Sequence, residues 1–303
     1  MSISSPGAAR PLGPAGHLPH KEPTSGRIRA NPSPTPHKGE GLGRGFVFRR
    51  KCTYRGAAAI ALLLASSALA GDTGPIAGNP LIEIPAGPFV FGRDDGPENE
   101  RPRRVVEGRA FAINRTEITN RQYASFIEKT GHRPSFYAGH PILGLDDRPV
   151  VGVSWADADA FCRHYGLTLP TEQQYERAAR GTKGNGFPWG DMPRDDMRAN
   201  GGADRCCAGD DRDGYLVTAP ADSFAAGASK EGVLNLVGNV WEWTSDVYAP
   251  YAEGSATGGD YRVLRGGSWN SDPRHLTTTY RLAYDPEFRF AANGGFRCVR
   301  SLP

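Results

Sequence analysis

Glycine and proline set the strongest limit on how this chain can fold. The 303 residues include 39 Gly and 25 Pro, about a fifth of the chain, and both residue types interrupt helices and strands. Segments without periodic patterning are therefore long, above all residues 181–233. Such loops are uncommon inside a compact domain, and a metal ion or a disulfide is the usual tether. We therefore expect a loop-rich fold built from short elements.

Three short helices are predicted by the signals at their ends. They lie within residues 119–131, 154–166 and 171–181, and each begins with Ser or Thr followed three residues later by Gln or Asp. This spacing is typical of a capping box, and glycine ends each pattern. Short β-prone runs occupy residues 87–92, 110–118, 261–267 and 294–300. No internal repeat of fixed period is visible, so the pattern predicts one α+β domain over residues 81–303.

The first 70 residues do not resemble a folded domain. Residues 1–46 are rich in Pro, Gly and Arg and are predicted to be a disordered extension, which could lie upstream of a true start near Val47. Residues 47–70 resemble a signal peptide, with a basic stretch at 49–55, the apolar run AAAIALLLA and the small-residue site Ala68-Leu69-Ala70. Cleavage would leave a linker at 71–80. The sequence does not choose between the general and twin-arginine export routes.

The charge of the chain changes when this segment is removed. The first 70 residues hold 10 of the 36 Lys and Arg but 2 of the 33 Asp and Glu, which leaves the remainder at about −5. Nucleic-acid binding therefore loses its compositional support. The apolar run is shorter than the roughly 20 residues that span a bilayer, so we expect no membrane anchor after cleavage. The predicted location is periplasmic or extracellular.

Four of the five cysteines follow the signal: Cys162, Cys206, Cys207 and Cys298. An even number in an exported chain indicates disulfides, with three possible connectivities.

The segment LNLVGNVWEW offers the hard oxygens of Asn235 and Glu242 around Gly238, which suits calcium. On chemistry alone this is a weak signal, because Asn-Gly turns next to Trp are usually just turns.

Seven segments occur together in a fixed order: IPAGPFVFG, EITNRQYASF, PVVGVSWADADAFCRHYGLTLPTEQQYERAARG, FPWGD, LNLVGNVWEWTSD, RVLRGGSW and GGFRC. Together they resemble the formylglycine-generating enzyme, or sulfatase-modifying factor, family over residues 81–300. That family also includes exported proteins of pyoverdine maturation and of nitrite-reductase gene clusters. The resemblance implies a loop-rich α+β fold related to C-type lectins.

The resemblance also implies structural calcium and one disulfide. The matching calcium positions are Asn235, Gly238, Val240 and Glu242 in one site, and Asn200, Gly201, Asp213 and Tyr215 in a second. The matching disulfide joins Cys162, on the second predicted helix, to Cys298, on the last predicted strand; two buried free thiols are the alternative. Cys206 and Cys207 would then remain as neighbours, able to form a vicinal ring, a cross-chain bond or a soft-metal site.

The segment after RGGS departs from the family's oxidases. There, two cysteines five residues apart bind copper(I), whereas this chain has Ser271 and Leu276 at the corresponding positions. Neither replaces a thiolate. Another branch holds iron with three histidines in an added helical domain, which is missing here, so no redox metal is assigned. What remains around the expected cleft is a polar and aromatic set suited to a polar ligand or peptide, although RGGSW could be a tight buried turn: Ser268, Trp269, Asn270, Ser271, Arg281 and Asn293.

Three functions follow from these observations. The first is an exported maturation or tailoring factor, an oxidoreductase-type enzyme if catalytic, that acts on a peptide-derived product or a partner enzyme. The second is a lectin-like module that binds a ligand without catalysis, because a fold does not fix a function. The third, true formylglycine generation, is disfavoured by the missing cysteine pair.

Overall fold

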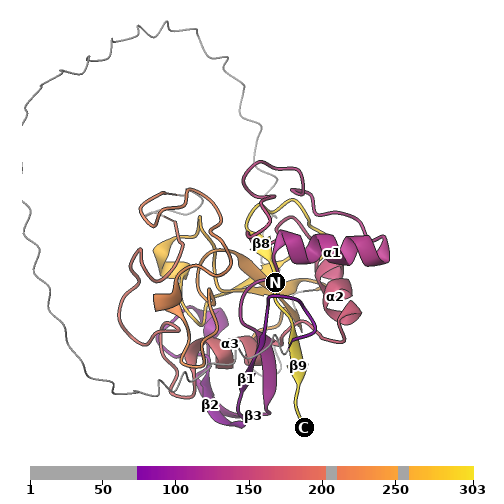
Figure 1. Cartoon of the computed structure of the whole chain (residues 1–303). Helices are drawn as coiled ribbons and strands as arrows, with labels where there is room; N and C mark the ends of the chain where they lie inside the picture. The colour runs from indigo at the N-terminus through magenta and orange to yellow at the C-terminus, as the bar shows by residue number, and fades with distance from the viewer. Residues whose placement is uncertain (1–73, 203–209, 252–258) are drawn as a thin grey trace, which may run out of the picture. The chain divides into compact units, whose positions relative to one another are not determined.

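The computed structural model describes residues 74–202, 210–251 and 259–303, all within one compact unit, Ala65–Pro303. The predicted signal peptide, its extension and Cys206–Cys207 lie outside the described residues. Within them the fold is α+β, as the sequence predicts (Figure 1). Its helices are α1 (Asn120–Thr130), α2 (Trp155–His164) and α3 (Glu172–Arg180), with 3-10 turns η1 (Glu98–Glu100), η2 (Ala225–Gly227) and η3 (Pro273–His275).

The three helices begin as their sequences predict. At each N-terminus the Ser or Thr side chain accepts from the backbone amide three residues later, and the Gln or Asp side chain there accepts from the capping residue's amide. Gly131 follows α1 in the left-handed region, at φ 69°, and its amide donates to Ile127. Because a capping box uses contacts only three residues apart, sequence alone sets where these helices start.

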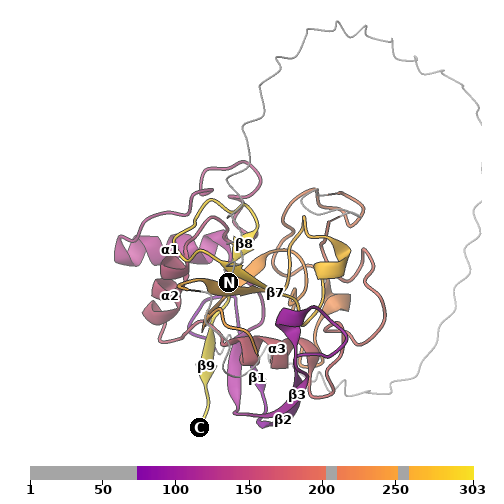
Figure 2. The ribbon, with the colours of Figure 1, turned by 180° about the vertical axis from the view of Figure 1, so that it is seen from behind.

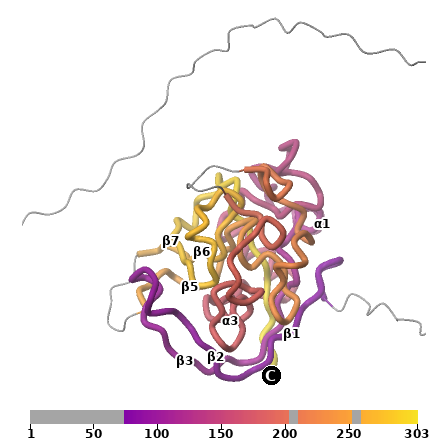
Figure 3. The backbone as a smooth tube through the Cα atoms, turned by 90° about the vertical axis from the view of Figure 1, so that its left-hand side faces the viewer, coloured from indigo at the N-terminus to yellow at the C-terminus, as the bar shows by residue number. Residues whose placement is uncertain are grey.

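The strands form three small sheets. The first has the order β1 (Leu81–Ile84), β4 (Phe111–Asn114), β9 (Val299–Ser301), and the second is the hairpin of β2 (Gly87–Phe91) and β3 (Arg104–Gly108). The third has the order β7 (Arg281–Tyr284), β6 (Arg262–Arg265), β5 (Trp241–Val247), β8 (Gly294–Gly295). Within this last sheet β5, β6 and β7 lie side by side (Figure 3) and are antiparallel neighbours. β8 pairs parallel to β5.

One predicted strand is wrong in extent. Residues 294–300 form two strands in different sheets, β8 and β9, so Cys298 lies just before the last strand rather than on it. The backbone between the two strands forms hydrogen bonds with residues 114 and 118: the Phe296 carbonyl accepts from the Ile118 amide, and the Cys298 carbonyl accepts from the Asn114 amide. The chain therefore passes from one sheet to the next within five residues.

The main core lies between the α1–α2 pair and the four-stranded sheet. Figures 1 and 2 show α1 and α2 together, apart from α3, which lies near β2 and β3. The rings of Tyr123 and Phe161 stack with centroids 5.9 Å apart, and Phe296 meets Phe161 edge-on at 5.3 Å. All three side chains are buried. This core holds the four-stranded sheet, and with it the candidate site, in place.

Candidate functional site

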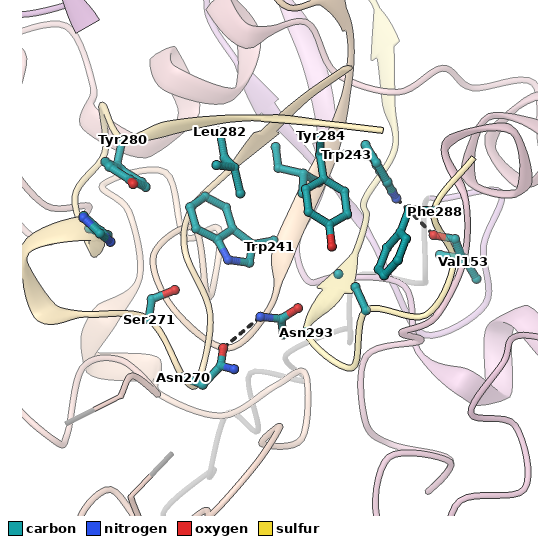
Figure 4. Close-up of a pocket in the computed structure, with 14 residues that line it drawn as sticks. Val153, Trp241, Trp243, Asn270, Ser271, Tyr280, Leu282, Tyr284, Phe288 and Asn293 are labelled. Atoms are coloured by element: carbon teal, nitrogen blue, oxygen red, sulfur yellow. Dashed lines mark hydrogen bonds between the residues drawn. The ribbon is translucent and has the colours of Figure 1, made fainter. Parts of the chain in front are cut away.

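A cavity of about 250 Å³ opens beside the four-stranded sheet. Trp241 and Trp243 on β5, and Leu282 and Tyr284 on β7, line it from alternate positions, because successive strand residues face opposite sides of a sheet. The rings of His275, Tyr280 and Phe288 come from the segments on either side of β7. In Figure 4 the aromatic side chains lie along one side and a polar group along the other. The lining residues are Val153, Trp241, Trp243, Leu264, Asn270, Ser271, His275, Tyr280, Leu282, Tyr284, Phe288, Ala291, Asn293 and Gly294.

Three of the six predicted cleft residues line this cavity: Asn270, Ser271 and Asn293. Ser268 lies behind them, fully buried. Asn293 Nδ2 donates to Asn270 Oδ1 at 2.8 Å and to Ser268 Oγ at 3.2 Å. The Ser268 amide donates to Ser271 Oγ at 3.0 Å. The polar side of the cavity is thus a preformed hydrogen-bonded group. The side-chain atoms Asn270 Nδ2 and Asn293 Oδ1 have no hydrogen-bond partner among the described residues.

The structure does not bring Arg281 or Trp269 into this cavity. Trp269 is half-buried, and its indole donates to the Ala292 carbonyl. Arg281 alternates with Tyr280 and Leu282, which line the cavity. Arg281 therefore points to the other face of β7, where its guanidinium pairs with Glu172 at 2.5 and 2.9 Å. The sequence-based assignment of Arg281 to the cleft is wrong for this reason.

Arg281 belongs to a buried ionic group between α3 and the sheet. Arg265 bridges the two acids of α3, with 3.0 Å to Glu172 and 2.7 Å to Glu176. Arg180 also pairs with Glu176, at 3.0 Å. Each carboxylate thus meets two guanidinium groups. Such a network compensates the cost of burying charges, so these arginines have a structural role.

The rings of the cavity were missed by the sequence analysis. His275 stacks on Tyr280 with centroids 4.2 Å apart and planes 13° apart. Burial raises the pKa of both Tyr280 and Tyr284 above the usual value for a phenol, so both are neutral at ordinary pH. The available signal was the alternation WEW and YRLAY, which places Trp241 with Trp243 and Tyr280 with Tyr284 on common faces.

Ser271 and Leu276 lie on the same side of Gly267. A Cβ added to that glycine would come within 2.7 Å of Leu276 Cδ2 and 3.6 Å of Ser271 Oγ. Both side chains are buried. The two positions that the resemblance aligns with copper-binding thiolates are therefore neighbours here. Ser271 offers one hydroxyl as a metal ligand, and Leu276 offers none. They do not fit copper(I), which selects soft thiolate ligands.

The first predicted calcium position contains an unpartnered buried oxygen. Asn235 Oδ1 is buried and accepts no hydrogen bond, while its Nδ2 donates to Glu117 and to the Ala221 carbonyl. An orphaned amide oxygen suits a hard cation. The Glu242 carboxylate, in contrast, already receives two hydrogen bonds from Arg297, of 2.6 and 2.8 Å. The residues fit calcium in part, with Glu242 shared with Arg297.

Glu117 was not singled out by the sequence analysis. Its carboxylate is fully buried and accepts from Asn235 and from Asn239 at 3.1 and 2.9 Å. Burial raises the pKa of Glu117 to about 7, although the nearby Arg297 acts in the opposite direction. Two acids and one arginine, all buried, therefore meet beside Asn235, and the group carries an excess of negative charge when both acids are ionised.

At the second predicted calcium position, Asp213 is hydrogen-bonded to two other residues of the proposed set. The Asp213 carboxylate accepts from the amides of Gly201 and Tyr215, at 3.1 and 3.0 Å. Asn200 Oδ1 is buried without a hydrogen-bond partner. Burial raises the pKa of Asp213, and nearby Asp210 adds to this effect. Asp213 thus contacts Gly201 and Tyr215, and the neighbouring Asn200 adds a buried side-chain oxygen; carboxylate and amide oxygens are ligands that suit calcium.

Cys162 and Cys298 form a disulfide, with Cα atoms 5.6 Å apart. This is the pairing that the resemblance implies, and it ties α2 to the segment before β9. No helix among the described residues is long and apolar enough to cross a membrane. Nor do those residues contain a group of three or more His, Cys, Asp or Glu side chains arranged to hold a metal ion.

Comparison with known proteins agrees with this architecture. The model of the sulfatase-modifying factor enzyme 1-like domain matches residues 72–302. The chain is 32% identical to the formylglycine-generating enzyme of Streptomyces coelicolor (79% of this chain, 96% of the relative). It is 30% identical to mouse inactive C-alpha-formylglycine-generating enzyme 2 (73% and 85%).

A relative with a different named activity and a solved structure are also similar to this chain. Hercynine oxygenase of Mycolicibacterium smegmatis is 33% identical over 68% of this chain, but the match spans 58% of that protein's length. The structure of PvdO from Pseudomonas aeruginosa superposes with a TM-score of 0.61 at 24% identity, over 73% of this chain and 94% of PvdO, which shows a shared fold. The chain therefore belongs to the sulfatase-modifying factor, or formylglycine-generating enzyme, family.

Proposed function

We propose that this chain is an exported maturation factor that holds a peptide-derived product or a partner protein in the aromatic cavity and does not generate formylglycine. One observation carries the proposal. The cavity is preformed, with rings from β5 and β7 facing the side-chain amides of Asn270 and Asn293, and beside it lie Ser271 and Leu276, which the resemblance aligns with the oxidases' cysteines. A cavity with such a lining supports binding, and the hydroxyl and the hydrocarbon at these two positions speak against copper(I) chemistry.

The cavity suits the recognition of one uncharged group on a larger substrate. Its lining contains no Asp, Glu, Lys or Arg among the described residues, so burying a charged group there would lack compensation. The names of two relatives, formylglycine-generating enzyme and hercynine oxygenase, denote different chemistry. A family with such variety supports a tailoring role for this chain on a substrate of its own.

Filling the cavity tests the proposal in the strain that makes the protein. Ala291→Leu adds three carbons to the lining, whereas Ala225→Leu adds them at an exposed position on η2. We expect the exported peptides and proteins of the Ala291→Leu strain to contain an immature species that differs in mass, detected by mass spectrometry. The Ala225→Leu strain should match the wild type. Identical mass profiles in all three strains would contradict the maturation role.

The absence of formylglycine chemistry has its own assay. Wild-type protein, copper, oxygen and a peptide bearing a sulfatase motif should give no aldehyde, because one hydroxyl and a hydrocarbon cannot hold copper(I). The double variant Ser271→Cys/Leu276→Cys should retain copper(I) against a chelator, and Ser271→Cys alone should retain far less. An aldehyde from the wild type would overturn this part of the proposal.

A binding module without catalysis is the second candidate, and the same cavity supports it. Rings and amides give binding, and the Ser271 hydroxyl of the lining is hydrogen-bonded to Ser268 rather than to His275, the one imidazole in the described lining. The two candidates separate when a peptide is bound and recovered. An unchanged mass after incubation in the cell's exported fraction favours the binding module, and an altered mass favours maturation.

We also propose that calcium binds both loop sites as a structural ion. The support is the pair of buried amide oxygens without partners, Asn200 Oδ1 and Asn235 Oδ1, which lie within the two predicted ligand sets. Calcium takes six to eight oxygen ligands, so backbone carbonyls and water would complete each shell. In such a site the ion supplies charge compensation and cross-links irregular segments.

A further inference from the structure

We infer that three exposed rings beside the cavity form a docking surface for a peptide-derived substrate. One side chain of that substrate enters the cavity, and the apolar segment next to it lies on the rings. The aromatic strip consists of Phe136, Phe288 and Phe290. This inference rests on the proposed function, in which the cavity holds part of that substrate.

The strip is continuous with the cavity. Phe288 lines the cavity and also meets Phe290 edge-on, with centroids 5.6 Å apart. Phe290 in turn meets Phe136 edge-on at 4.7 Å. On the inner side, Phe288 meets Tyr284 at 5.4 Å. Rings therefore run without a break from the cavity to the surface.

The three phenylalanine side chains of the strip are exposed to solvent. Phe136 is 53% exposed, Phe290 52% and Phe288 39%. Scattered apolar side chains are normal on a surface, but contiguous aromatic groups mark interaction sites. Aromatic residues are also enriched at the energetic centres of interfaces. The contact between these rings, rather than the exposure of one, distinguishes the strip.

Hydrogen bonds hold the strip in place before any ligand arrives. The Tyr137 hydroxyl donates to the Phe290 carbonyl at 2.9 Å, and Arg289 Nη2 donates to the Pro134 carbonyl at 2.6 Å. The Gly152 amide donates to the Ala291 carbonyl at 3.0 Å. Residues 134–137 and 289–291 are thereby joined. A preorganised surface loses less conformational freedom on binding and so binds more tightly.

The size of the cavity determines the kind of occupant. Drug-sized ligands occupy pockets of roughly 300–1,000 Å³, whereas an apolar cavity of about 150 Å³ takes benzene. At about 250 Å³, this cavity accommodates one ring-sized side chain and not a whole peptide. The rest of the substrate must lie outside, and the rings adjoining the cavity favour apolar neighbours there. The inserted group is uncharged because the described lining contains no charged side chain.

Calorimetry with two probes tests the inference on the full exported protein. The short probe is N-acetylphenylalanine amide, and the long probe is a blocked pentapeptide with phenylalanine between two leucines and serine at each end. The strip variant is Phe136→Ser/Phe290→Ser, and the control is Met197→Ser, which removes another exposed apolar side chain. A pentapeptide with lysine in place of phenylalanine tests the need for an uncharged group.

We expect the long probe to bind the strip variant about tenfold more weakly than the wild type, because the variant lacks two rings that contact this probe. The affinity of the short probe should fall less than twofold. Met197→Ser should change neither, and the lysine peptide should not bind.

Unchanged affinity for the long probe, or equal losses for both probes, would overturn the docking surface but leave the cavity site standing. If neither probe bound the wild type, the proposed function would fail as well. A wild-type dimer that the strip variant converted to a monomer would assign the strip to a second copy of this chain and overturn the inference.

Discussion

Asp157 connects the start of α2 to the loop after α1. Its carboxylate closes the capping box with the Ser154 amide, at 2.9 Å, and pairs with Arg133 at 2.6 and 3.0 Å. Burial would raise the pKa of Asp157, but the hydrogen bonds from Arg133, Ser154 and His132 outweigh it and lower the pKa to about 2. A single side chain thereby joins two elements.

Replacing Asp157 should change how stability depends on pH. Because its folded-state pKa lies below the unfolded value, its contribution is full above about pH 4 and is lost as pH falls toward 2. We expect Asp157→Asn to lower the free energy of unfolding by about 2 kcal/mol at pH 7, with the difference from wild type vanishing near pH 2. Urea titrations at several pH values measure this.

Asp159 supplies the control for that experiment. It lies on the same helix and pairs with Arg163, whose side chain is 72% exposed. Such surface pairs contribute at most about 1 kcal/mol, so Asp159→Asn should give a small change at every pH. A difference between wild type and Asp157→Asn that stayed constant down to pH 2 would contradict the assigned role of Asp157.

Among the elements, α2 is fixed to the C-terminal part of the chain by a covalent bond. The Cys162–Cys298 disulfide joins residues 136 apart in sequence. In the chain-entropy model a bridge over such a loop contributes about 4–5 kcal/mol. The double variant Cys162→Ala/Cys298→Ala should lose about that much free energy of unfolding, measured in urea. Peptide mapping that found either thiol free in exported protein would contradict the pairing.

The two proposed calcium loops lie in segments with little regular structure. Calcium at about 100 times its dissociation constant should add roughly 2.7 kcal/mol per site, and a chelator should lower the melting temperature of the wild type. Asp213→Asn should reduce the stabilisation by calcium, because it removes a charged ligand of the second site. Asp211→Asn, at an exposed neighbouring position, should leave it intact. A melting temperature unaffected by the chelator would refute both sites.

For the whole molecule, export is the prediction that decides where the protein works. Cleavage after Ala70 is expected from the small-residue site behind a short apolar run. N-terminal sequencing of secreted or periplasmic protein should read from Gly71. Replacing Ala68 by a bulky residue should block processing, whereas the same change at Ala59 should not alter the cleavage site. A protein recovered with residues upstream of Val47 would contradict a signal at 47–70.

The sequence by itself determined the features that depend on neighbouring residues. The starts of α1, α2 and α3 follow from capping boxes whose partners lie three residues apart. The class of fold followed from short capped helices among β-prone runs, and the ordered motifs identified the family. Part of the candidate site was also found, since Asn270 and Ser271 lie in one short segment beside the cavity.

Only the tertiary structure decided which side chains meet in the cavity. Trp241 and Tyr284 are far apart in sequence and are brought to one face by the pairing of β5 with β6 and of β6 with β7. Arg281 was expected at the cleft, yet alternation along β7 turns it toward Glu172. The aromatic strip joins residues 136 and 290 through hydrogen bonds between loops. Such contacts depend on the register and packing of distant segments, which local sequence patterns do not specify.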